Sequence, residues 1–407
     1  MSYKLLKITN YYKYYFKYYY DKFPQIKEKS YDEQHAHLMK QYVAWSDFYA
    51  NALKKQGVEA AEIVYNATAI QNQWAKEKGI DAKGIDILTA QIKDYKPDIL
   101  WFQDSFSFDA DYMKDLRRIV PSVKLLIGNS CAPYTPKNID NLKIFDFVTT
   151  CSPKFVQNFE SYGLKTLMLY HAFEPKILPE ITSPEKIRDF IFVGSIIPRK
   201  DFHIQRKTFL EKLAANPDID FSYFGNLSNV KYSEVLKLQL LYGAKEVMLK
   251  TGASKFFQNS VKFKKMENLN AFPKYFKFSK ALQDSYQSEL YGIDMFREIA
   301  RSKITFDIQV EIEGDYAGNM RMFESTGAGA CLLLENKINV PDIFEPDKEV
   351  VIYNSFDEAM EKIIWLLNNE NKLVEIAKAG QKRTLKDHTY DKRATDLINE
   401  IDKYLKK

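Results

Sequence analysis

Short apolar segments alternate with helical stretches twice along this chain, and this alternation restricts its fold more than any other feature. The first series of apolar segments comprises residues 3–8, 60–65, 97–102, 123–127, 147–150 and 166–169. The stretches between them, such as residues 85–93 and 153–162, carry apolar side chains at a helical period. Strands separated by helices at this spacing predict a parallel sheet with helices on both faces.

A proline-marked linker follows at Pro175, Pro179 and Pro184, and the alternation then starts again. The second series of apolar segments comprises residues 190–194, 221–225, 304–308 and 330–334, and a last helix is expected over 389–405. A chain of 407 residues is too long for one ordinary hydrophobic core. We therefore predict an α/β protein with two Rossmann-like, doubly wound domains, at 1–178 and 179–388, that face a ligand-binding cleft.

The composition excludes several classes of protein. No apolar run approaches the ~20 residues of a membrane-spanning helix, and the N-terminus lacks the apolar core of a signal peptide. The three cysteines, Cys131, Cys151 and Cys331, are far apart in the sequence. This spacing argues against a disulfide framework or a zinc site and for a reducing compartment, so we expect a cytoplasmic protein.

A helical insertion at about 227–288 interrupts the second domain and is unusually basic. Residues 231–280 hold eleven lysines and three glutamates, a net charge of +8, interleaved with aromatic side chains such as Phe256, Phe263 and Tyr275. One interpretation is a solvated helical segment. The other is a surface for anionic lipid at the inner face of a membrane, where each lysine contributes about 1 kcal/mol. Nucleic acid is not expected as a partner, because the rest of the chain is acidic and carries no nucleic-acid-binding motif.

Residues 318–334 combine a helix start, two charged side chains and a turn of small residues. Arg321 and Glu324 stand three residues apart and so share one helix face, and a Gly-Ala-Gly turn leads into an apolar segment. Free N–H groups at a helix start bind phosphate, and a carboxylate one turn later can accept from two ribose hydroxyls. The pattern suits a nucleotide-diphosphate sugar. The alternative is an ion pair on a helix surface.

A second group of candidate residues follows the first strand of the second domain. Gly194 lets the backbone approach a ligand closely, Ser195 comes next, and Arg199, Lys200 and Arg206 lie within reach of a diphosphate. Their charge would stabilise a departing diphosphate. The alternative is an exposed loop with ordinary surface cations.

Several short motifs follow one another in a fixed order along residues 188–405. They are Phe192-Val193-Gly194-Ser195, Arg321-Met322-Phe323-Glu324, Gly327-Ala328-Gly329, Ala379-Gly380, His388-Thr389-Tyr390 and Arg393. In this order they resemble the C-terminal domain of GT-B glycosyltransferases of the CgeB-like, glycosyl transferases group 1 family. The first half fits more loosely, through residues 96–100 and 170–175. One position departs from the family, because Tyr316 stands where many members have a second glutamate, and Glu311 and Glu313 are out of register.

The resemblance implies a GT-B fold in which a C-terminal helix, residues 389–407, crosses back to the first domain. It further implies a metal-independent hexosyltransferase without a cofactor, in which Glu324 binds the ribose of the donor. The implied donor-site residues are Gly194, Ser195, Arg199, Lys200, Arg206, Gly318, Asn319, Arg321, Glu324 and Thr326. The implied reaction moves a sugar from a nucleotide-diphosphate sugar to a glycan or lipid-linked acceptor, in surface polysaccharide or glycoconjugate synthesis.

The first domain is expected to supply the acceptor site and any catalytic base. Asp104 directly follows the third strand and would face the cleft, although Asp also caps turns and helices. His37, like His35, lies near the start of one long helix predicted over residues 34–56, and His171 lies near the linker. Asp104, His37 and His171 are therefore the candidate catalytic residues, with a purely structural role as the alternative for each.

The triplet Asp109-Ala110-Asp111 has the pattern of a metal-binding D-x-D motif. It immediately precedes a stretch predicted to be helical, where an aspartate is a favourable cap. We therefore expect a helix cap here and no metal.

Residues 11–20 contain seven tyrosines and one phenylalanine, the most unusual local composition in the chain. Aromatic faces suit the C–H surface of a sugar, and tyrosine with lysine suits a membrane interface. Tyr11, Tyr12, Tyr14 and Tyr15 are therefore a candidate acceptor region, and packing against the body of the domain is the alternative.

Two other functions remain open. One is a GT-B-fold enzyme of another class, such as a nucleotide-sugar epimerase. The other is a non-catalytic module that binds a nucleotide or a glycan, which the missing first glutamate of the family pattern makes conceivable.

Overall fold

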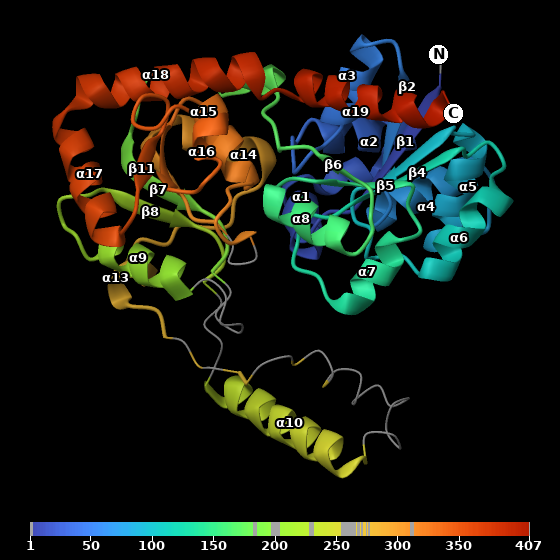
Figure 1. The fold of residues 1–407 in the computed structure, drawn as a ribbon, viewed down its shortest axis with the longest axis horizontal. Coiled ribbons are helices and arrows are strands. Elements are labelled where there is room, and N and C mark those ends of the chain that lie inside the picture. The colour runs from blue at the N-terminus through green and yellow to red at the C-terminus, as the bar shows by residue number, and fades with distance from the viewer. Residues whose placement is uncertain are drawn as a thin grey trace.

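Two parallel β-sheets form the framework of the molecule (Figure 1). The computed structural model describes residues 3–181, 185–196, 204–227, 232–253, 266, 269, 272–273, 275, 277–309 and 313–406. The first sheet has six strands in the order β2-β1-β3-β4-β5-β6, and the second has five in the order β11-β10-β9-β7-β8. Each neighbouring pair is parallel. The predicted pair of doubly wound α/β units is confirmed.

The first sheet and its helices use the chain up to the linker. The strands are β1 (Lys4–Thr9), β2 (Glu59–Val64), β3 (Ile99–Phe102), β4 (Leu125–Asn129), β5 (Phe147–Thr150) and β6 (Thr166–Met168). The helices are α1 (Lys13–Lys22), η1 (Pro24–Glu28), α2 (Tyr31–Met39), α3 (Phe48–Lys55), α4 (Thr68–Glu77), α5 (Ile85–Tyr95), α6 (Ala110–Ile119), α7 (Pro136–Leu142), α8 (Pro153–Ser161) and η2 (Pro175–Glu180).

The second sheet and its helices follow. The strands are β7 (Arg188–Val193), β8 (Phe221–Phe224), β9 (Ser302–Asp307), β10 (Cys331–Glu335) and β11 (Val351–Tyr353). The helices are α9 (Ile204–Ala214), α10 (Tyr232–Thr251), α13 (Lys280–Asp284), α14 (Gly292–Ala300), α15 (Met320–Gly327), α16 (Val340–Ile343), α17 (Phe356–Asn368), α18 (Glu370–Asp387) and α19 (Tyr390–Leu405).

Strand β3 is apolar along its whole length because helices cover both faces of the first sheet. All four residues of β3 are buried, and their side chains alternate between two separate apolar clusters, with Trp101 in one and Phe102 in the other. Burial on both faces is the usual reason for continuous apolar runs in parallel strands.

The last helix returns to the first domain. Figure 1 shows α18 over the second sheet and α19 over the first. The ring of Tyr390 lies 4.9 Å from that of Phe48 on α3, and Lys55 pairs with Asp391 at 2.8 Å. The predicted crossing of the C-terminal helix is confirmed.

The single long helix predicted over residues 34–56 is wrong, because the structure divides this stretch into α2 and α3. Between them, Tyr42, Ala44 and Ser46 adopt positive φ angles of 55°, 52° and 40°, which no helix continues through. The apolar side chains whose spacing suggested a continuous helix lie partly in a compact turn instead. A hydrogen bond across the turn, from the Ser46 hydroxyl to the Met39 carbonyl at 2.8 Å, holds it in place.

Helix α10, inside the basic insertion, lies apart from both sheets (Figure 1). Val235 is buried, but several of the helix's large apolar side chains are exposed, with Tyr232 at 60%, Leu236 at 44% and Leu240 at 68%. Within the described ranges, every helix is too short or too polar to span a bilayer.

Candidate functional site

The candidate site lies where the strand order of the second sheet reverses. The chain moves from β7 outward to β8 in one direction, and from β9 to β10 and β11 in the other. Ligands of open α/β sheets bind beyond the carboxyl ends of the strands at such a switch point. Gly194 and Ser195 follow β7 there, and Asp307 ends β9.

Arg206 joins the two strand ends. Its side chain is buried, and its guanidinium donates to the carbonyl of Ser195 at 3.0 Å and to that of Ile308 at 2.9 Å. The guanidinium also lies 5.4 Å from the ring of Phe192. The structure thus places the predicted phosphate ligand Arg206 at the switch point, with backbone carbonyls as partners. The other two predicted cations, Arg199 and Lys200, lie outside the described residues.

A hydrogen-bonded chain of side chains connects β9 to the start of α15. The Gln309 amide donates to Asp307 at 2.8 Å, and its oxygen accepts from the backbone N–H groups of Gly318 and Asn319 at 3.1 and 3.2 Å. The two amides predicted to face phosphate are therefore occupied by one side-chain oxygen. Burial raises the pKa of Asp307 to about 6, although Arg206 counteracts part of this shift.

Helix α15 holds the predicted Arg321–Glu324 pair. Asn319 caps the helix by accepting from the Arg321 N–H at 3.1 Å. The Arg321 guanidinium lies 2.8 Å from the Glu324 carboxylate, and the two side chains are only 16% and 9% exposed. The same guanidinium contacts the sulfur of Met295 at 2.9 Å. The pair is therefore mostly desolvated and is not an ordinary ion pair on a helix surface.

Thr326, also predicted to bind the donor, lies on another face of α15. Its hydroxyl donates to the Met322 carbonyl at 2.7 Å and is 2.6 Å from the hydroxyl of Thr384. The structure places it in the buried contact between α15 and α18.

Glu313 is a buried carboxyl group just before this helix. It is 3% exposed, and its Oε2 atom has no hydrogen-bond partner among the described residues. Burial, with the negative charges of Asp307 and Cys131, raises the pKa of Glu313 to about 8. The group is therefore largely protonated at neutral pH and can donate a hydrogen bond.

The first sheet has a matching switch point between β1 and β3, where Asp104 lies. The Asp104 carboxylate accepts from Asn10 at 2.6 Å and from the Phe106 N–H at 3.0 Å, and it also bonds the Ser107 hydroxyl. A further bond joins Thr9 to Gln103 at 2.8 Å across the same two strands. Asp104 thus lies at the carboxyl edge of the sheet, as predicted, and it also closes a turn.

The candidate histidines have partners inside the first domain. His37 lies 2.8 Å from the Tyr19 hydroxyl, and His35 lies 3.0 Å from the carbonyl of Glu62. His171 is buried and accepts from the indole of Trp45 at 3.1 Å. His37 and His171 thus have different hydrogen-bond partners, Tyr19 for the one and Trp45 for the other.

The tyrosine-rich segment forms helix α1, and its side chains divide by face. Tyr11 and Tyr15 are buried, and the ring of Tyr15 lies 5.4 Å from that of Tyr291 in the second domain. Tyr12 and Tyr14 are exposed. Partial desolvation raises the pKa of Tyr12, and the negative charge of Glu324 raises it further. The charge of Glu324 on α15 therefore acts on Tyr12.

The Asp109 triplet caps a helix, as predicted. The Asp109 carboxylate accepts from the Asp111 N–H at 2.8 Å at the start of α6.

The two domains meet beside the start of α15. A Cβ atom on Gly318 would come within 2.7 Å of the Cys151 carbonyl and 2.9 Å of Ser152 Cβ. The Gln157 amide also donates to the Tyr316 hydroxyl at 2.9 Å. Only glycine therefore fits at position 318, and the loop before α15 packs directly against the end of β5.

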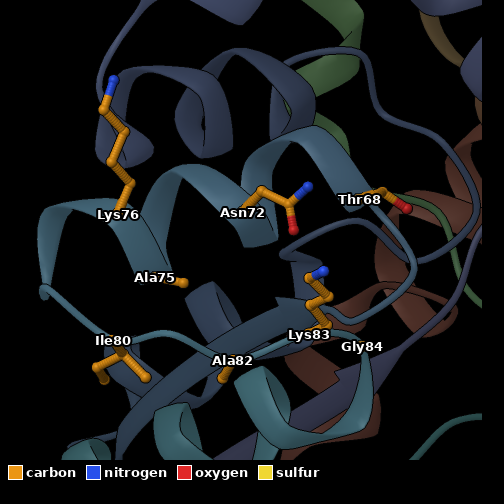
Figure 2. A pocket seen from close by; sticks show the side chains of 8 residues that line it. All are labelled: Thr68, Asn72, Ala75, Lys76, Ile80, Ala82, Lys83 and Gly84. Carbon is orange, nitrogen blue, oxygen red and sulfur yellow. The ribbon is translucent and has the colours of Figure 1, made fainter.

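A surface pocket of about 410 Å³ lies elsewhere, between α4 and the segment before α5 (Figure 2). Its lining includes Asn72, Lys76 and Lys83. It contains none of the residues of either switch point.

The sequence did not single out Asp307, Gln309 or Glu313 as site residues. Asp307 carried a usable signal, because it ends an apolar strand next to the switch point. The position of Gln309 depends on how its side chain folds back, and no spacing rule indicates that.

The comparisons with known proteins agree with this geometry. Residues 205–399, just under half of the chain, match the family model described as glycosyl transferase-like. None of the curated proteins matches the sequence. Among solved structures, the chain is similar to a glycosyltransferase from Rickettsia africae, with 10% identity, a TM-score of 0.56, and coverage of 100% of this chain and 99% of the other.

Two further structures share the architecture. Sucrose-phosphate synthase from Thermosynechococcus elongatus is 9% identical, with a TM-score of 0.54 and 99% coverage of both chains. Anabaena HepE in complex with UDP-glucose is 10% identical, with a TM-score of 0.52 and coverage of 98% of this chain and 100% of HepE. The chain has the GT-B fold, and residues 205–399 match the glycosyl transferase-like family model.

Proposed function

We propose that this protein transfers a sugar from a nucleotide-diphosphate sugar to a glycan or lipid-linked acceptor, in the synthesis of a surface polysaccharide or glycoconjugate. One observation carries the proposal: a polar network joins β7, β9 and the start of α15 at the switch point of the glycosyl transferase-like half. HepE, which has the same fold, has been crystallised with UDP-glucose.

The proposed donor site uses the start of α15. The Gln309 oxygen accepts from the amides of Gly318 and Asn319, which is the geometry that a phosphate oxygen would adopt at a helix start. We infer that the diphosphate replaces this side chain. Glu324 then accepts from the ribose hydroxyls, and Arg321 turns from Glu324 towards the phosphates.

The departing diphosphate needs compensation of its negative charge. We propose that Arg206, Arg321, Arg199, Lys200 and the helix amides supply it without a metal ion. Addition of a chelator should therefore leave transfer unchanged. A requirement for Mg²⁺ or Mn²⁺ would contradict this part of the proposal.

The first domain is proposed to hold the acceptor. Asp104 at the β1–β3 switch point would orient the attacking hydroxyl and accept its proton, and the exposed rings of Tyr12 and Tyr14 would cover the sugar faces. Glu313 is mostly neutral at pH 7, so it would donate a hydrogen bond to the donor sugar rather than present a charge.

Replacement of Glu324 by Ala tests the donor site. Titration calorimetry with UDP, GDP, CMP and dTDP identifies the ligand first. Because Glu324→Ala loses charge-assisted hydrogen bonds to the ribose, its affinity for that nucleotide should be about tenfold to a hundredfold weaker than that of wild type. The control is Glu375→Ala, because Glu375 is exposed on α18, where it pairs with Lys372. Equal donor affinity and turnover in wild type and Glu324→Ala would refute the assignment.

The products distinguish the related functions. Transfer to a glycan or lipid-linked acceptor supports the proposal. Epimerisation of the free donor would favour an epimerase. Nucleotide binding without turnover on a broad acceptor panel would favour a non-catalytic module.

Helix α10 is proposed to contact an anionic membrane. The exposed side chains of Tyr232, Leu236 and Leu240 recur every four residues, and residues 231–280 carry a net charge of +8. Apolar insertion combined with lysine attraction is the usual mode of interfacial helices. Sedimentation with phosphatidylserine vesicles should exceed that with phosphatidylcholine vesicles, and Leu236→Ser/Leu240→Ser should reduce it. Equal binding to both vesicle types would contradict the proposal.

A further inference from the structure

Two thiols and an imidazole meet at the carboxyl ends of β4, β5 and β6, and the proposed reaction does not use them as a group. One ligand atom each from Cys131, Cys151 and His171 lies within 4.8 Å of the others. Cys151 and His171 are buried, whereas Cys131 is only partly buried. The cysteines that are distant in sequence are therefore adjacent in space, and Cys131 is the less buried of the two.

The register of the sheet brings the two thiols together. The β4–β5 ladder pairs Asn129 with Thr149, so two residues further along Cys131 lies opposite Cys151, on the same face of the sheet. The Ser130 N–H donates to the Thr149 carbonyl at 3.1 Å, which keeps the chains adjacent beyond the ladder. Neighbouring strands lie about 4.8 Å apart, and disulfides join Cα atoms about 4.4–6.8 Å apart. The backbone spacing therefore suits a disulfide.

The histidine argues against a metal ion at this cluster. The Trp45 indole can only donate, and it donates to Nδ1 of His171 at 3.1 Å. Nδ1 therefore keeps its lone pair for the indole, and the proton of the neutral ring is on Nε2. A metal on Nδ1 would displace Trp45, and a metal on Nε2 would leave a proton on Nδ1 that faces the indole N–H. Metal-binding histidines usually have an acceptor at the second nitrogen.

The two thiols differ in character. Burial raises the pKa of Cys131, but hydrogen bonds from Cys151 and His171 outweigh it and lower this pKa to about 6. Burial and the neighbouring thiolate raise the pKa of Cys151 well above its ordinary value. Accessible thiolates are the reactive ones. Cys131, the less buried residue, is therefore assigned as the nucleophile, and the thiol of Cys151 stays protonated beside it.

We propose that Cys131 and Cys151 form a redox-active dithiol, in which a peroxide oxidises Cys131 and Cys151 then closes a disulfide. The Cys131 sulfur attacks one peroxide oxygen, the O–O bond breaks, and the hydroxide that leaves takes a proton to become water. The Cys151 sulfur then attacks the sulfur of the Cys131 sulfenic acid. The S–O bond breaks, and the released oxygen leaves as a second water with the Cys151 proton. The two thiols lose two electrons in total, and the peroxide gains them.

The site lies at the boundary of the domains. A Cβ atom added at Gly318 would come nearest to the carbonyl oxygen of Cys151, at 2.7 Å. A disulfide would therefore form directly against the loop that precedes α15.

Hydrogen peroxide added to the reduced full-length protein tests the proposal. We expect two of the three thiols to disappear, the intact mass to fall by two hydrogens, and a peptide map to show a Cys131–Cys151 link that dithiothreitol reverses. Cys151→Ser should stop at a sulfenic acid on Cys131 that dimedone traps. Cys331→Ser is the matched control, since Cys331 is buried in β10, and it should still form the link.

The wild-type peptide map decides the outcome even if a cysteine variant folds poorly. Three unchanged thiols, or over-oxidation of Cys131 with Cys151 left free, would overturn the proposal. One equivalent of zinc chloride provides the competing test. Zinc retained one-to-one after dialysis by wild type, and not by Cys131→Ser, would identify a metal site and would also overturn it.

Discussion

The buried carboxyl of Glu313 gives the sharpest test of the site's electrostatics. Its folded-state pKa is raised from 4.5 to about 8, whereas the unfolded chain releases the proton near the ordinary value. Between these two pH values the folded state binds more protons than the unfolded state, so the free energy of unfolding falls as pH rises. Glu313→Gln keeps the size of the side chain and removes the titration.

The magnitude follows from the width of this window. Each pH unit within it changes the free energy of unfolding by ~1.4 kcal/mol. Between pH 5 and pH 7.5, wild type should therefore lose about 3 kcal/mol that Glu313→Gln does not lose.

Urea unfolding of both proteins at several pH values between 5 and 8 measures the difference. Glu361→Gln, on the exposed side of α17, is the control and should follow wild type. Parallel stability curves for wild type and Glu313→Gln would show that Glu313 is already ionised in the folded protein. The account of a neutral carboxyl at the donor site would then be wrong.

Three further substitutions test the framework that positions the site. Lys7→Met leaves Glu62 buried without the partner that now lies at 2.6 Å, so it should lower the free energy of unfolding by about 3–5 kcal/mol. The double variant Lys7→Met/Glu62→Leu should recover most of this loss. Wild-type stability of the single variant would disprove the pairing. Gly292→Ala would bring a Cβ within 1.8 Å of the Gln41 carbonyl at a φ of +52°. It should therefore lower the free energy of unfolding by more than about 1 kcal/mol, seen as a lower melting temperature. An unaltered melting temperature would mean that this contact between the domains is loose. Asn319→Ala removes the cap of α15 and should cost about 1 kcal/mol in urea unfolding, and wild-type stability would show that the cap contributes nothing.

The sequence predicted the architecture because the architecture follows from local patterns. Continuous apolar strands alternating with helices are sufficient to indicate two parallel sheets and their carboxyl edges. The same kind of reasoning failed between Met39 and Phe48. The apolar spacing there fits a helix, but three residues with positive φ turn the chain so that Gln41 can accept from the N–H of Ile293 in the second domain.

The site was predictable only in part, for a related reason. Gly194, Arg321 and Glu324 follow strand ends and helix starts, which sequence patterns mark. The position of the Gln309 oxygen on two amides depends on side-chain packing. The contact between Cys131 and Cys151 depends on strand register, which their distance in the sequence conceals.

Diffraction from crystals soaked with the nucleoside diphosphate that binds most tightly locates the bound donor in the protein. We predict a phosphate oxygen on the N–H groups of Gly318 and Asn319, with the Gln309 side chain displaced and the ribose on Glu324. A diphosphate bound elsewhere, with Gln309 still on both amides, would contradict it.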